Sequence, residues 1–97
     1  MSLRATTLFL VVMLPGCTGR GVLPAGGVLP DAGTPAAQIY SKRCGICHAV
    51  PHPARHSYTG WLRLLPLMEQ RMAERGIRPL TDEERSAILR YLQAHAR

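Results

Sequence analysis

The stretch Cys44-Gly45-Ile46-Cys47-His48 places two thiols and an imidazole side by side near the middle of a 97-residue chain. Thiols and imidazoles are common metal ligands, and thiols also form covalent bonds with cofactors. Cys44 and Cys47 are three residues apart, and His48 follows directly. On one turn of helix, all three side chains would reach the same bound group. We therefore expect this segment to form the functional site and the rest of the fold to surround it.

The Cys-x-x-Cys-His spacing is that of covalent attachment of one haem c, with both thiols bonded to the porphyrin and His48 bonded to the iron. Three other interpretations use the same residues. A thioredoxin-like redox pair needs a βαβ setting, which this sequence does not supply. Half of a zinc site needs a second ligand pair, for which His52 and His56 are the candidates. A disulfide between the two cysteines would leave His48 without a role.

Residues 1–16 have the pattern of a secretory signal peptide. Arg4 gives a short positive region, and the apolar run from Leu8 to Leu14 is too short to span a bilayer. The run ends in Leu14-Pro15-Gly16-Cys17, which resembles the lipobox of bacterial lipoproteins. Cys17 is the third cysteine of the chain and has no partner once Cys44 and Cys47 bind one haem. An unpaired thiol is unusual in a secreted protein, which favours lipidation of Cys17. Ordinary cleavage near Gly16 is the alternative.

The composition of residues 17–35 predicts a flexible tether, lipidated at Cys17. They are rich in Gly, Pro, Ala and Val, and they contain Gly-Val-Leu-Pro twice, starting at Gly21 and at Gly27. The remaining domain, residues 36–97, is of a size at which an apolar core alone is marginal. A haem bonded into the core would supply the missing stability.

The domain is expected to be all-α, with helices over residues 36–47, 59–75 and 81–94. Pro66 should kink the second helix or split off its first turn, and Gly76 should end it. Thr59 is the expected N-cap of the second helix, and Thr81 forms a capping box with Glu84 at the start of the third. Two prolines exclude a helix from the loop over residues 49–57.

With this arrangement the chain resembles the small class I cytochromes c, in which an N-terminal helix packs against a C-terminal helix beside the haem. In that family an aromatic residue lies four positions before the first haem cysteine and a small residue lies eight before it. Tyr40 and Ala36 occupy those positions, and Tyr91-Leu92 matches the aromatic-leucine pair of the C-terminal helix. The resemblance implies a three-helix domain around one covalent haem c, held by Cys44, Cys47 and His48.

The resemblance also implies a methionine as the second axial ligand of the iron, a ligand that raises the reduction potential. Met68 and Met72 are the candidates in the mature chain. Similar haem domains often show a tryptophan followed seven residues later by a methionine, and Trp61 with Met68 matches this spacing. Met72 fits the distance to the downstream glycine and the Leu-Thr-x-Glu-Glu turn about as well. Ligation by His52 or His56 would lower the potential and is the third possibility.

Class I cytochromes commonly orient the proximal histidine through a proline carbonyl about a dozen residues further on. Pro51 and Pro53 come much sooner in this chain, and we expect one of these carbonyls to bind the His48 ring.

The formal net charge is +6. We expect a positive ring around a haem edge, formed by Lys42, Arg43, Arg63, Arg71, Arg75, Arg78 and Arg85. Such a surface steers acidic partners toward the cofactor. Nucleic acid is not an expected partner, because a secreted protein works outside the cytoplasm.

The resemblance implies an electron-transfer protein, with no catalytic residues of its own. It would be a membrane-tethered carrier on the periplasmic side of the bacterial cell envelope. The outer membrane is the expected location, because the residue after Cys17 is Thr18 and not the aspartate that retains lipoproteins at the inner membrane. The alternatives are a haem enzyme or gas sensor with an open sixth site, the electron-entry subunit of a larger oxidoreductase, and a lipoprotein without haem.

Overall fold

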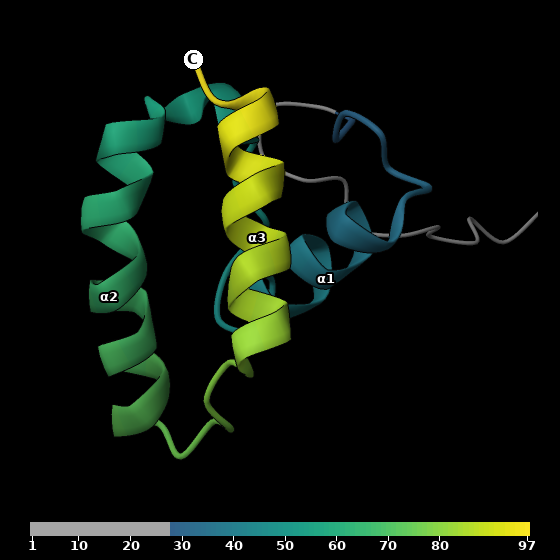
Figure 1. The fold of residues 1–97 in the computed structure, drawn as a ribbon. Coiled ribbons are helices and arrows are strands. Elements are labelled where there is room, and N and C mark those ends of the chain that lie inside the picture. Colours follow the sequence, from purple (N-terminus) through teal and green to yellow (C-terminus); the bar gives the residue numbers. More distant parts are fainter. Residues whose placement is uncertain (1–27) are drawn as a thin grey trace, which may run out of the picture.

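The computed structural model describes residues 28–97, and within them the chain is all-helical. It consists of α1 (Pro35–Cys44), the short 3-10 helix η1 (Pro53–Arg55), α2 (Tyr58–Glu74) and α3 (Asp82–His95). The prediction of no helix in the loop over residues 49–57 was wrong for η1, which begins at Pro53 because proline is tolerated at the start of a helix. Helices α2 and α3 run in opposite directions, and α1 crosses α3 from behind (Figure 1). No strand occurs in this part of the chain, so the predicted all-α fold class is confirmed.

The helix starts follow from side chains that cap the free backbone N–H groups. At the start of α3, the Thr81 hydroxyl accepts from the Glu84 N–H at 3.1 Å and the Glu84 carboxylate accepts from the Thr81 N–H at 3.0 Å. This confirms the predicted capping box. Helix α2 begins earlier than predicted, because Ser57 and not Thr59 is its N-cap.

Helix α1 ends at Cys44, three residues before the predicted end, so Cys47 and His48 lie outside it. Gly45 is the C-cap, and a Cβ atom there would come within 2.7 Å of the Ser41 carbonyl oxygen and 2.8 Å of the Val50 side chain. The chain turns back at Gly45, and Val50 packs against the end of the helix. That return is the reason the helix cannot continue through Cys47.

Helix α2 ends as predicted at Gly76, whose φ of 67° is the left-handed conformation that favours glycine. The Gly76 N–H donates to the Ala73 carbonyl at 3.1 Å and the Ile77 N–H to the Met72 carbonyl at 2.9 Å, which is a Schellman motif. Pro66 does not split off a first turn, since α2 continues through it without a break. Pro66 is exposed, so water can bind a carbonyl that lacks its helical donor.

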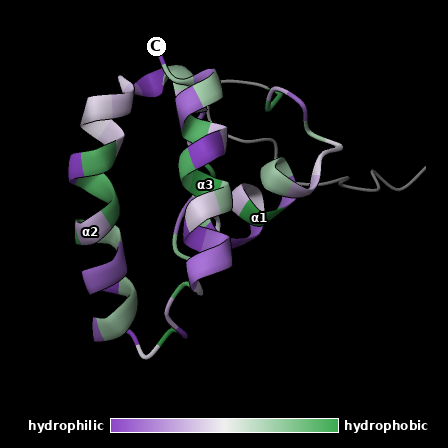
Figure 2. Cartoon of the chain, viewed as in Figure 1, coloured by the Kyte–Doolittle hydropathy of each residue, from purple (hydrophilic) through white to green (hydrophobic). Residues whose placement is uncertain are grey.

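The core lies between α1 and α3 and extends to one face of α2. Tyr40 of α1 is 0 % exposed, and its ring lies 5.0 Å from that of Tyr91 and 6.5 Å, edge-on, from that of Trp61. Ile88 and Leu92 of α3 are buried in the same cluster. The predicted contact between the first and last helices, through Tyr40 and Tyr91-Leu92, is therefore confirmed. Figure 2 shows apolar and polar residues alternating around α2 and α3, as amphipathic helices require.

Residues 28–34 form an N-terminal strap that packs on α3, although the sequence pattern assigned them to the tether. Leu29 is 8 % exposed and belongs to the core cluster. The Tyr91 hydroxyl donates to the Pro30 carbonyl at 2.8 Å, and His95 lies 3.1 Å from the Asp31 carboxylate. The packed domain thus includes residues before position 36.

The predicted signal peptide, the lipidation site Cys17 and tether residues 17–27 lie outside the described residues. Within residues 28–97, no helix combines the length and the apolar character needed to cross a membrane.

Candidate cofactor site

One cavity of about 270 Å³ brings the predicted site residues together. Its lining comes from the end of α1, the segment after it, α2, the loop before α3, and α3: Arg43, Cys44, Cys47, His48, Leu65, Met68, Arg71, Met72, Arg75, Leu80 and Ile88. Both cysteines, the adjacent histidine and both candidate methionines therefore border the same space. Cys47 and His48 also border a shallower hollow of about 510 Å³, which neither Cys44 nor any methionine lines.

The floor of this cavity is apolar. Leu65, Leu80 and Ile88 are buried members of the core cluster. These three residues carry no sequence signature, and only the fold shows that they line the site. A floor of this kind excludes water from a bound flat apolar group, and the group would in turn complete the core.

The imidazole of His48 is exposed, and its Nδ1 lies 2.9 Å from the Ala49 carbonyl oxygen. A carbonyl oxygen only accepts hydrogen bonds, so this contact favours the tautomer with the proton on Nδ1. The Nε2 lone pair is then available to a metal.

The predicted bond from His48 to a proline carbonyl is not found. The Pro51 carbonyl accepts from the Tyr40 hydroxyl at 2.7 Å, and the Pro53 carbonyl accepts from Trp61 Nε1 at 2.7 Å. The two prolines therefore fix the loop after His48 to α1 and to α2. No sequence pattern indicated that two buried aromatic donors would compete for these carbonyls.

Both thiols are free of disulfide bonds, with Cys44 half-buried and Cys47 exposed. Burial raises the pKa of the Cys44 thiol to about 12, against a smaller opposing effect of the Arg43 charge. A thioredoxin-like nucleophile needs a lowered pKa instead. The environment of Cys44 thus opposes the interpretation as a redox pair.

The two further histidines near the site have other contacts. His52 caps η1, where its Nδ1 accepts from the Ala54 N–H at 3.1 Å. The His56 ring packs edge-on against Trp61 at 4.8 Å. Neither lines the cavity, and in residues 28–97 no three His, Cys, Asp or Glu side chains are grouped as a metal site would require. Histidine as the sixth ligand and half of a zinc site both lack geometric support.

The two candidate methionines differ in burial. Met72 is 9 % exposed and belongs to the core cluster, whereas Met68 is half-buried and packs at its edge. Both border the cavity. Met72 therefore already fills the core, and the Met68 thioether has fewer packing contacts to give up on binding a metal.

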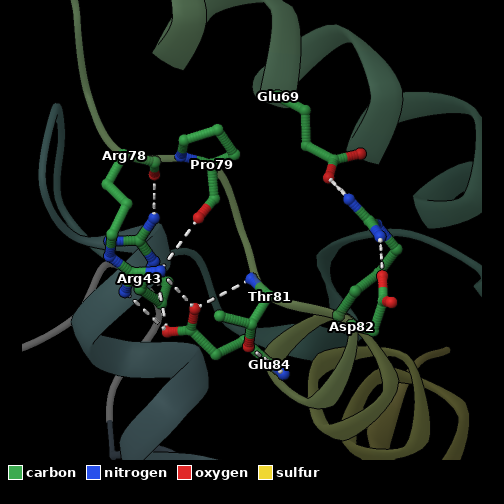
Figure 3. Close-up of polar contacts among 8 residues, drawn as sticks. Arg43, Glu69, Arg78, Pro79, Thr81, Asp82 and Glu84 are labelled. Carbon is green, nitrogen blue, oxygen red and sulfur yellow. Dashed lines mark hydrogen bonds and ion pairs between the residues drawn. The ribbon is translucent and has the colours of Figure 1, made fainter.

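The predicted positive ring is partly neutralised by carboxylates. Arg71 lies 3.0 Å from Glu74, Arg85 pairs with Glu69, and Arg78 binds Glu84 with two hydrogen bonds of 2.9 and 3.2 Å. Within the described residues, Lys42, Arg63 and Arg75 have no carboxylate partner. The pairing of Arg43 and Arg78 with Glu84, drawn in Figure 3, was not anticipated from the sequence.

No protein-family profile, curated protein or solved structure matches this chain.

Proposed function

We propose that this protein is a single-haem c-type cytochrome that carries single electrons between redox partners. The observation behind the proposal is the cavity that Cys44, Cys47, His48 and Met68 border together. Two free thiols, an imidazole with an available Nε2, a thioether and an apolar floor form a donor set that fits one covalent haem.

Each side chain has a distinct task in this proposal. Cys44 and Cys47 would hold the porphyrin through thioether bonds. His48 would bind the iron through Nε2 while the Ala49 carbonyl orients its ring. Met68 would be the second protein ligand of the iron, with Met72 as the alternative. When bound, haem provides a one-electron couple of ferric and ferrous iron, and a thioether ligand raises its potential.

The lining of the cavity favours electron transfer over catalysis or gas sensing. Haem enzymes usually place acid-base groups beside the open iron site. Among the described residues that border this cavity, the only ionisable side chains besides the two thiols and His48 are those of Arg43, Arg71 and Arg75. A guanidinium does not exchange protons near neutral pH.

The proposed place of work is the periplasmic side of the bacterial cell envelope. The signal peptide, lipidation at Cys17 and the tether would hold the domain at a membrane within reach of its partners. Exposed Lys42, Arg63 and Arg75 would attract redox proteins with acidic docking surfaces.

The experiment is maturation of the full chain in a bacterial periplasm, followed by intact mass measurement and haem staining of a denaturing gel. The wild type should carry one covalent haem. The double variant Cys44→Ser/Cys47→Ser should carry none. Cys17→Ser is the matched control, which should lose the lipid and keep the haem. A haem-free wild type, or a double variant that still stains, would contradict the proposal.

A further inference from the structure

A buried positive charge lies in the wall of the cavity. Arg43 is 8 % exposed, comes directly before Cys44 and lines the cavity beside it. One of its terminal nitrogens donates to the Arg78 carbonyl. Its Nε is buried without a hydrogen-bond partner, at 3.5 Å from the Glu84 carboxylate. Buried arginines are almost always fully paired, so the unpartnered Nε of Arg43 calls for an explanation.

The surrounding cluster does not cancel this charge. Glu84 is shared with Arg78, which binds it at 2.9 and 3.2 Å, and with the Thr81 N–H at 3.0 Å. Figure 3 shows both guanidinium groups facing the Glu84 carboxylate. Two positive charges therefore face one negative charge, and the cluster keeps a net positive charge next to the cavity.

We propose that Arg43 raises the reduction potential of the haem, an inference that rests on the proposed function. Ferric iron carries one more positive charge than ferrous iron, so a fixed positive charge nearby disfavours the ferric state. A buried charge acts through a lower effective dielectric constant than an exposed one, so it acts more strongly on the iron at equal distance. Mobile ions also screen it less.

Lys42 is the matched control for Arg43. It carries the same charge one residue earlier in α1, but it is exposed. Arg43→Gln should lower the midpoint potential more than Lys42→Gln does. The shift should be similar at about 0.05 M and about 1 M salt, whereas that of Lys42→Gln should shrink as salt screens it. Arg43→Lys keeps the charge and should restore most of the potential.

Glu84→Gln gives a second and opposite test, which does not depend on removing a buried arginine. Glutamine replaces glutamate in capping boxes, so α3 should keep its start. Loss of the carboxylate leaves both guanidinium charges uncompensated, and the potential should rise.

The test is redox titration of the matured proteins at low and high salt, with chemical unfolding of each variant as the second measurement. A haem-loaded Arg43→Gln whose potential equals that of wild type, or whose shift vanishes at high salt, would overturn the inference. So would a Glu84→Gln potential that does not rise. A wild type without covalent haem would instead overturn the proposed function, and this inference with it.

Discussion

Tyr40→Phe removes one oxygen atom from a side chain that is 0 % exposed. The lost hydroxyl is the donor to the Pro51 carbonyl at 2.7 Å, and Pro51 is itself buried. The ring contacts with Tyr91 and Trp61 remain. The substitution therefore isolates one hydrogen bond, the bond that fixes the loop after His48 to α1.

The expected cost comes from the acceptor left behind. A buried carbonyl without a donor loses about 1–3 kcal/mol relative to the paired state. For a domain of this size, each kcal/mol lowers the melting temperature by roughly 4–8 °C. Tyr40→Phe should therefore lower the free energy of unfolding by about 1–3 kcal/mol.

The other two tyrosines provide matched controls. Tyr91→Phe removes a bond to the Pro30 carbonyl at 2.8 Å in a partly exposed place, where water can replace the donor, and should cost about 1 kcal/mol or less. The Tyr58 hydroxyl makes no hydrogen bond to the described residues, so Tyr58→Phe should change stability by less than about 0.5 kcal/mol.

The assay is denaturant unfolding of the matured proteins, followed by the fluorescence of the single tryptophan, Trp61. The order of loss should be Tyr40, then Tyr91, then Tyr58, with unchanged denaturant slopes. A Tyr40→Phe protein as stable as Tyr58→Phe would refute the assigned role of the Pro51 bond.

Four further substitutions test other parts of the structure. Met68→Ala should let carbon monoxide bind the reduced haem. Met72→Ala should cost about 2–5 kcal/mol and keep the wild-type spectrum. Carbon monoxide binding by Met72→Ala and not by Met68→Ala would make Met72 the ligand. The Arg78 hydrogen bonds and the Thr81 N–H lower the pKa of Glu84 to about 2, so its stabilising effect should be lost as pH falls from about 5 toward 2. Unfolding midpoints of wild type and Glu84→Gln should therefore differ near neutral pH and converge in acid. Leu29→Ala should cost about 2 kcal/mol or more because the N-terminal strap belongs to the core, and a result within about 0.5 kcal/mol of wild type would mean that it does not.

Two helix ends that local chemistry determines could be predicted from the sequence. The capping box of Thr81 and Glu84 and the left-handed Gly76 need only neighbouring residues. The end of α1 could not be predicted in this way. It depends on Val50 packing at Gly45, a contact that forms only after the chain has turned back.

Some features of the candidate site could likewise be predicted from local sequence, and others depend on the fold. The Cys-x-x-Cys-His spacing and the methionines were visible in the sequence, and the fold brings them to one cavity. The apolar floor of Leu65, Leu80 and Ile88 and the pairing of Arg43 with Glu84 bring together residues far apart in the chain, so no local sequence pattern predicts them. The carbonyls of Pro51 and Pro53 accept hydrogen bonds from Tyr40 and Trp61, because buried donors need acceptors. Which donors are buried near these carbonyls is known only from the packed core.

The most direct measurement is the visible spectrum of the matured protein, oxidised and reduced, with and without carbon monoxide. A six-coordinate haem held by His48 and a methionine predicts a low-spin c-type spectrum with a weak far-red band of the oxidised form, unchanged by the gas. A high-spin spectrum, or one that shifts with carbon monoxide, would mean an open iron site and would contradict the electron-carrier function.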